Sequence, residues 1–230
     1  MKLHKPLDEA VYDKAGNEVP QVNTIDNPLY YNECRSCRNF FDENLLGFLS
    51  LALIFLLINL ITRKNYLLNL ILNISFFFRA IFLIVDHLLI QRNRGGDAGS
   101  FETFAAFWSS KGFPELFYYF FQNGASWTYA NLISVVYGIF GRSHMMMEAI
   151  NIFFGMLLII LCYKFVYLIT SNYKRALFIS IILSFHPIIF YLSTISIRDI
   201  IVIYLLTLAI YYFIIWVKKI YLYILFYLFF

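Results

Sequence analysis

One carboxylate has neighbours that suit it for chemistry. Asp97 lies in the glycine-rich stretch RNRGGDAGSFETF, close to Arg92 and Arg94. A carboxylate can take a proton from the hydroxyl or amine of an acceptor, and arginines bind anionic phosphate groups. We therefore interpret Asp97 as a catalytic base and both arginines as substrate-binding residues. The alternative is a solvated turn whose acid has no role.

A second candidate is the stretch SIRD at residues 196–199. Arg198 could bind a phosphate, and Asp199 could contact a substrate or a metal. The structural alternative is that Asp199 caps the helix after it while Arg198 anchors that helix at the membrane interface. We include both residues in the substrate-binding set.

Three more residues complete this set: Glu102, Glu148 and His186. The two glutamates fall near the same membrane boundary as Asp97. His186 precedes Pro187, which can kink a helix, and a lone histidine there is more often a packing residue than a ligand. We predict no metal site and no cofactor, and we leave a divalent cation open.

Two charged residues fall inside a predicted membrane helix. Arg79 and Asp86 lie two turns apart on one face of it. Charges inside a membrane are costly, so we expect these two to pair toward the interior, with a functional role equally open. In the N-terminal tail, Cys34 and Cys37 would form a disulfide if the tail is external and remain thiols if it is cytosolic.

Membrane helices must position these groups. The chain has 230 residues, is 61% hydrophobic and is only 14% charged, which is too little charge for a soluble protein of this size. Apolar runs of about 17 to 25 residues recur, the length that crosses a bilayer. The sequence predicts an all-α, polytopic integral membrane helical bundle at residues 45–230 after a polar tail at residues 1–44. The predicted spans are about 45–62, 66–90, 145–163, 176–192 and 200–217, with a partial run at 220–230.

An outer loop at residues 91–143 separates the second and third spans. Aromatic residues near helical spacing at 101–112 predict an amphipathic helix at headgroup depth, and residues 129–140 predict another helix. The run at 220–230 is too short to cross a bilayer. We therefore expect the chain to be a fragment, a truncated product or one with a re-entrant end.

The charges are sorted along the chain. The linkers at 63–64, 164–175 and 218–219 hold seven basic residues and no acid. The positive-inside rule places them in the cytoplasm, so the active face would be extracytoplasmic, on the inner (plasma) membrane of a bacterium. Nucleic acid is excluded as a partner because the basic residues form no stripe. The acids after the tail all fall at the opposite face: Asp86, Asp97, Glu102, Glu115, Glu148 and Asp199.

The order of these parts resembles the GT-C class of membrane glycosyltransferases, which includes protein O-mannosyltransferases and lipid A aminoarabinose transferases. The likeness rests on the outer-loop Asp, the aromatic helix ending in glycine, the segment YANLISVVYGIFG and the hairpin SNYKRALFISIILSFHPIIFYLSTISIRD. It covers about residues 66–219. The resemblance implies that Asp97 takes the place of the catalytic carboxylate, and that Arg198 and Asp199 occupy a later outer loop that often holds an acid.

The resemblance also implies a function: the N-terminal part of a membrane glycosyltransferase. Its donor would be a polyprenyl-phosphate-linked sugar, and its acceptor a glycan, lipid or protein of the cell envelope. The alternatives are a flippase for lipid-linked oligosaccharide, a polysaccharide repeat-unit polymerase, and a non-catalytic fragment or accessory subunit. Polar residues gather toward one membrane boundary, which favours surface chemistry over transport.

Overall fold

The computed structural model describes residues 11–12, 18–19, 40–87, 97–110 and 127–229, and the side chains of 44–87, 99–110 and 127–218. The chain divides into two units, residues 1–37 and 38–230. In the first unit, β1 (Val11–Tyr12) and β2 (Glu18–Val19) form an antiparallel ladder. Five residues singled out by the sequence lie outside the described residues: Cys34, Cys37, Arg92, Arg94 and Glu115.

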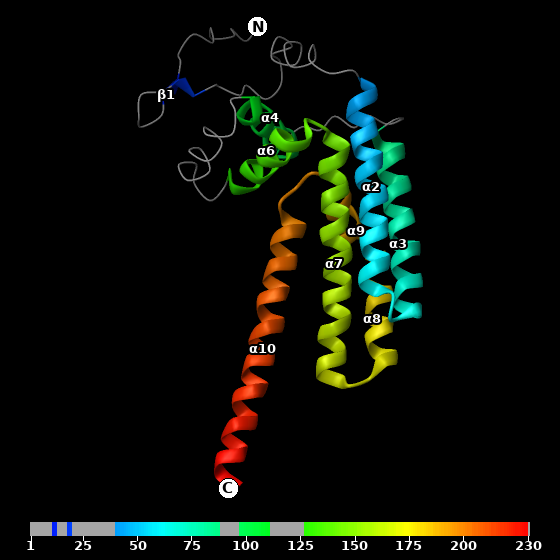
Figure 1. Cartoon of the computed structure of the whole chain (residues 1–230), viewed down its shortest axis with the longest axis vertical. Coiled ribbons are helices and arrows are strands. Elements are labelled where there is room, and N and C mark those ends of the chain that lie inside the picture. Colours follow the sequence, from blue (N-terminus) through cyan, green and yellow to red (C-terminus); the bar gives the residue numbers. More distant parts are fainter. Residues whose placement is uncertain (1–10, 13–17, 20–39, 88–96, 111–126, 230) are drawn as a thin grey trace, which may run out of the picture. The chain divides into compact units, whose positions relative to one another are not determined.

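The described part of the second unit is helical (Figure 1). Its helices are α2 (Phe40–Thr62), α3 (Tyr66–Val85), α4 (Asp97–Ser110), α6 (Thr128–Phe140), α7 (His144–Thr170), α8 (Tyr173–Phe185), α9 (Pro187–Thr194) and α10 (Asp199–Phe229). Helices α2, α3, α7 and α10 each contain a stretch long and apolar enough to cross a membrane, and α8 with α9 can form a fifth span. The predicted all-α membrane bundle is confirmed, and the chain is a multi-pass integral membrane protein.

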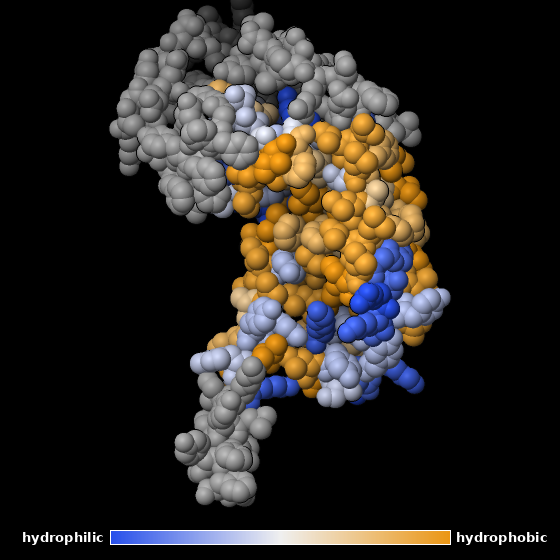
Figure 2. All heavy atoms as spheres, in the orientation of Figure 1, coloured by the Kyte–Doolittle hydropathy of each residue, from blue (hydrophilic) through white to orange (hydrophobic). Residues whose placement is uncertain are grey.

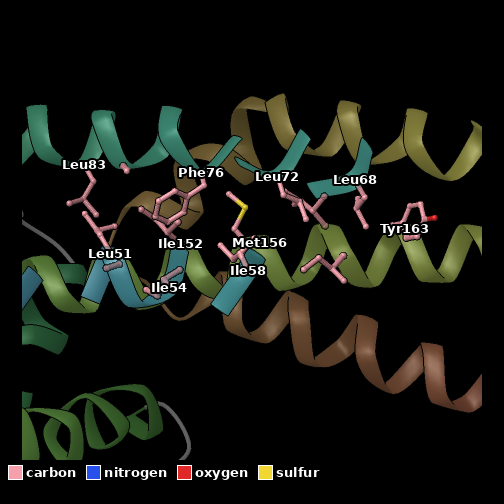
Figure 3. Packing of buried hydrophobic residues seen from close by; sticks show 14 of the residues in the cluster. Leu51, Ile54, Ile58, Leu68, Leu72, Phe76, Leu83, Ile152, Met156 and Tyr163 are labelled. Atoms are coloured by element: carbon pink, nitrogen blue, oxygen red, sulfur yellow. The ribbon is translucent and has the colours of Figure 1, made fainter. Parts of the chain in front are cut away.

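The core of the bundle lies where α2, α3 and α7 meet. Figure 3 shows its buried side chains, among them Leu51, Ile54, Ile58, Leu68, Leu72, Phe76, Leu83, Ile152 and Met156. Gly47 lets α2 approach α7 closely, because an added Cβ would lie 2.6 Å from the Cβ of Met145. Large apolar side chains remain exposed on the outer faces of the helices, and Figure 2 shows them as a hydrophobic surface. In a membrane protein this surface faces lipid.

Several helices differ from the predicted spans: α2 begins at residue 40, α3 ends at residue 85, and α7 continues to residue 170, into the predicted linker at 164–175. Two further spans differ in how they are built. The run at 176–192 is two helices that meet at a bend of 59°, because Pro187 lacks a backbone N–H and begins α9 after the extended residue His186. The runs at 200–217 and 220–230 are one continuous helix, α10. Lysine is a good helix former, so Lys218 and Lys219 do not interrupt it.

The helices α2, α3, α7, the α8–α9 pair and α10 run in alternating directions (Figure 1), which sorts the charges to two ends of the bundle. Turns α2–α3 and α7–α8 share one end, and Lys218 Nζ donates a hydrogen bond to the Leu168 carbonyl there at 2.8 Å. We call this end of the bundle the basic end. Figure 2 shows hydrophilic side chains gathered toward it, below the hydrophobic surface. Among the described side chains, its cations are Arg63, Lys64, Lys164, Lys174, Arg175 and Lys218. The opposite, acidic end holds Asp86, Asp97, Glu102, Glu148 and Asp199.

Candidate active site

Helix α4 crosses the acidic end and packs on α6. Asp97 is its first residue, so the helix begins four residues before the predicted start at 101. The side chain of Asp97 lies outside the described side chains. The backbone thus places the predicted base at the N-terminus of a helix rather than in a loop.

A two-point ion pair fixes α4 to the turn before α7. Arg142 Nε donates to Glu102 Oε1 at 2.8 Å and Arg142 Nη2 donates to Glu102 Oε2 at 3.1 Å. The Glu102 side chain is 8% exposed and that of Arg142 is 29% exposed. Paired, charge-assisted hydrogen bonds of this kind set orientation as well as adding stability. The predicted substrate-binding carboxylate Glu102 is therefore engaged within the protein.

Aromatic side chains fill the contact between α4 and α6. The Phe101 ring meets Tyr129 edge-on at a centroid distance of 5.4 Å, and the Phe104 ring meets Trp127 at 4.3 Å. The guanidinium carbon of Arg198 lies 5.7 Å from the centre of the Phe101 ring. Guanidinium groups are attracted to aromatic faces, so this contact joins the loop before α10 to α4. Arg198 and Asp199 themselves are exposed.

Buried polar side chains hydrogen-bond to the loop between α9 and α10. Asn151 Nδ2 donates to the carbonyls of Ile195 at 2.5 Å and Ile197 at 3.0 Å. The Tyr129 hydroxyl donates to Asn151 Oδ1 at 3.4 Å and lies 3.2 Å from Ser196 Oγ. Burial raises the pKa of Tyr129 to about 12, so its hydroxyl keeps its proton. The network thus holds the backbone that carries Arg198.

A second buried carboxylate lies in the first turns of α7. Glu148 Oε1 is 3.2 Å from His144 Nε2, one helical turn away, and Glu148 is 3% exposed. The two form an ion pair when His144 is protonated. Tyr137, on the neighbouring helix α6, is also buried, and burial together with the charge of Glu102 raises the pKa of its hydroxyl well above the ordinary value. Its hydroxyl has no partner among the described residues.

His186 and Arg79 lie away from these groups. His186 stands at the break between α8 and α9, and α9 separates it from Arg198. Arg79 is fully buried in α3, where Nε donates to Ser193 Oγ at 2.8 Å, Nη1 donates to Ser75, and the guanidinium lies over the Phe190 ring. The described partners of Arg79 are thus the Ser75 and Ser193 hydroxyls, the Ser75 carbonyl and the Phe190 ring, and Asp86 is not among them. Among the described residues no three His, Cys, Asp or Glu side chains form a metal-binding group.

The structure therefore joins some predicted residues and leaves others apart. Glu102 belongs to α4 and pairs with Arg142, and Arg198 lies against the Phe101 ring of the same helix. Glu148 lies one turn after His144 at the start of α7, and His186 is separate. Sequence reasoning missed Arg142, Tyr129 and Asn151. In the sequence, Arg142 follows Gly141 at the end of a predicted helix. That position puts a cation at the same membrane boundary as the acids, but it does not indicate that Glu102 is its partner.

The conserved pattern of a known family covers much of this architecture. The family model described as dolichyl-phosphate-mannose-protein mannosyltransferase matches residues 105–226, more than half of the chain. The chain belongs to this family. Mannosyltransferases of this family are membrane glycosyltransferases of the GT-C class with a lipid-phosphate sugar donor, as the sequence resemblance implied. No curated protein and no solved structure matches the chain.

The matched range divides the candidate site of this mannosyltransferase-family protein. Arg142, Glu148, His186, Arg198 and Asp199 lie within it. Asp97 and Glu102 lie before residue 105, although they belong to the same helix, α4, in which the match begins. The family match therefore does not include these two residues.

Proposed function

We propose that this protein transfers a sugar from a polyprenyl phosphate to an envelope glycan, lipid or protein, and that the reaction takes place at the acidic end. The observation that carries the proposal is the family match combined with the placement of Arg198 against α4, the helix that begins at Asp97. A phosphate-binding cation and a carboxylate are then held on neighbouring elements, as sugar transfer from a phosphate requires.

In the proposed reaction, Asp97 takes the proton of the acceptor hydroxyl or amine as the acceptor atom bonds to the anomeric carbon. The bond between that carbon and the phosphate oxygen breaks, and the electron pair leaves with the lipid phosphate. Arg198, with Arg92 and Arg94, holds this phosphate and stabilises the charge that develops on it. Asp199, one residue after Arg198 and exposed, faces the same solvent for contact with the sugar or acceptor.

Glu102 has a different role in this proposal from the one that the sequence suggested. Its carboxylate is occupied by both nitrogens of the Arg142 guanidinium fork. We therefore assign Glu102 as a positioning residue, which fixes α4 and with it the backbone of Asp97. The positive-inside rule assigns the basic end to the cytoplasm, so the acidic end would lie on the opposite side of the membrane. That membrane would be a bacterial inner membrane.

The test is a transfer assay with purified protein in liposomes and a labelled polyprenyl-phosphate sugar. Asp97→Asn should lower the transfer rate by about 10²-fold or more, the contribution of a general base. Its unfolding midpoint in detergent should match that of the wild-type protein. The control is Asp13→Asn in the N-terminal tail, which should leave the rate unchanged. Transfer by Asp97→Asn within about threefold of the wild-type rate would remove Asp97 from the reaction.

A further inference from the structure

A hollow opens at the basic end, away from the candidate active site. It has a volume of about 280 Å³ and lies between the last turns of α7 and the facing part of α10. Its lining comprises Tyr163, Lys164, Tyr167, Leu168 and Ser171 of the α7 end and Tyr211 of α10. The rings of Tyr163 and Tyr167 are stacked, with centroids 6.4 Å apart and an interplanar angle of 4°. An aromatic wall and a cation thus share one small hollow.

The position of this hollow along α7 matches the depth of lipid headgroups. From Met145 to Tyr163, α7 has one charged residue, the buried Glu148 near its start, and at about 1.5 Å per residue this range is about 28 Å long, close to the thickness of a hydrocarbon core. Lys164 is the first charged residue after this run and is exposed. Tyrosine rings also favour this boundary, where the ring is apolar and the hydroxyl is wet.

The charge around the hollow is positive. Lys218 does not line the hollow, but its Nζ donates to the carbonyl of Leu168, a lining residue, so a second ammonium group lies at the edge of the hollow. The nearby linkers, 63–64, 164–175 and 218–219, contain no acid in the sequence. Tyrosine and serine hydroxyls supply hydrogen bonds at the wall. Two cations, hydroxyl donors and apolar ring faces together suit a phosphate diester attached to acyl chains.

We propose that this hollow binds the headgroup of an anionic phospholipid of the surrounding leaflet. Lys164 and Lys218 would neutralise the phosphate, the hydroxyls of Tyr167 and Ser171 would donate to its oxygens, and the acyl chains would lie on the exposed apolar faces of the spans. The site lies at the opposite end of the bundle from Asp97 and Arg198, and it does not depend on the glycosyltransferase reaction.

Native mass spectrometry of the purified full chain, titrated with phosphatidylglycerol, tests this site. Each lysine near a lipid phosphate contributes about a fivefold gain in affinity. Lys164→Gln should therefore weaken phosphatidylglycerol binding about fivefold. The matched control is Lys64→Gln, an exposed cation at the same end that does not line the hollow, and it should leave the affinity unchanged. Tyr167→Leu, which keeps the charge, should also weaken binding.

Three outcomes would overturn the proposal. Equal losses for Lys164→Gln and Lys64→Gln would mean a diffuse attraction of the whole basic end. Equal binding of phosphatidylcholine, which carries no net charge, would mean that the anionic headgroup is not recognised. Displacement of phosphatidylglycerol by inorganic phosphate at similar concentration would mean a site for free phosphate rather than for a lipid.

Discussion

The ion pair between Glu102 and Arg142 should stabilise the packing of α4 measurably. Glu102→Gln keeps the shape of the side chain but removes the charge that both Arg142 nitrogens contact. Hydrogen bonds to charged groups contribute about 1.5–3 kcal/mol, and loss of one partner from a fully buried ion pair costs about 3–5 kcal/mol. Because the Arg142 side chain is 29% exposed and stays partly hydrated, we expect Glu102→Gln to lower the free energy of unfolding by about 2–3 kcal/mol.

A double-mutant cycle separates this pair from general destabilisation. Unfolding of Glu102→Gln, Arg142→Gln and the double variant would be followed in mixed micelles of dodecyl maltoside and dodecyl sulfate. We expect a coupling energy of about 1–2 kcal/mol, since the two side chains interact directly. The control is Arg175→Gln, an exposed arginine at the basic end, whose effect should stay within about 0.5 kcal/mol.

The same variants test whether the pair positions the proposed base. If α4 holds Asp97 in place, Glu102→Gln should lower kcat while KM for the lipid-linked donor stays close to the wild-type value. A coupling energy below about 0.3 kcal/mol, or a loss seen only in KM, would refute the reasoning that the pair fixes α4 for catalysis.

Other predictions follow from single contacts. Gly155→Ala should lower the free energy of unfolding by about 1–3 kcal/mol in the same micelle titration, because its Cβ would lie 2.7 Å from the Ser193 Cβ. Gly138→Ala, at an exposed position of α6, should instead raise the free energy of unfolding by about 0.5–1 kcal/mol. Equal effects of the two substitutions would contradict this packing. Asn151→Leu should speed amide hydrogen exchange in the loop after α9, since two carbonyls lose their donor; unchanged exchange would argue against the network. Ser143→Ala should cost about 1 kcal/mol, because its Oγ accepts from an N–H in the first turn of α7, and a neutral result would exclude that cap.

The membrane helices were predictable because bilayer thickness sets the length of an apolar run. The runs at 145–163 and 66–90 could be recognised from composition alone. Helix α7 covers the first run, and α3 covers residues 66–85 of the second. The start of α4 could not be recognised, because Gly99 lowers helix propensity there. Packing of α4 on α6 stabilises the helix there, and no local sequence pattern reveals that packing.

The candidate site was less predictable because its contacts join distant parts of the chain. Glu102 and Arg142 are 40 residues apart, so helical periodicity contains no sign of their pairing. Arg79 was expected to pair with Asp86 on its own helix, but its described hydrogen bonds go to Ser75 on that helix and to Ser193, 114 residues away. Local spacing limits which residues share a helix face, whereas the packing of distant segments decides which of them meet.

The proposed extracytoplasmic reaction is tested most directly by measuring on which side of the membrane the acidic end lies. In a variant whose native cysteines are replaced by serine, Ser110→Cys on α4 and Asn65→Cys in the α2–α3 turn would each be labelled in intact bacterial cells with a membrane-impermeant maleimide. We predict that Ser110→Cys is labelled and that Asn65→Cys is labelled only after the cells are broken. Labelling of Asn65→Cys and protection of Ser110→Cys in intact cells would place the carboxylates in the cytoplasm and contradict the proposed extracytoplasmic reaction.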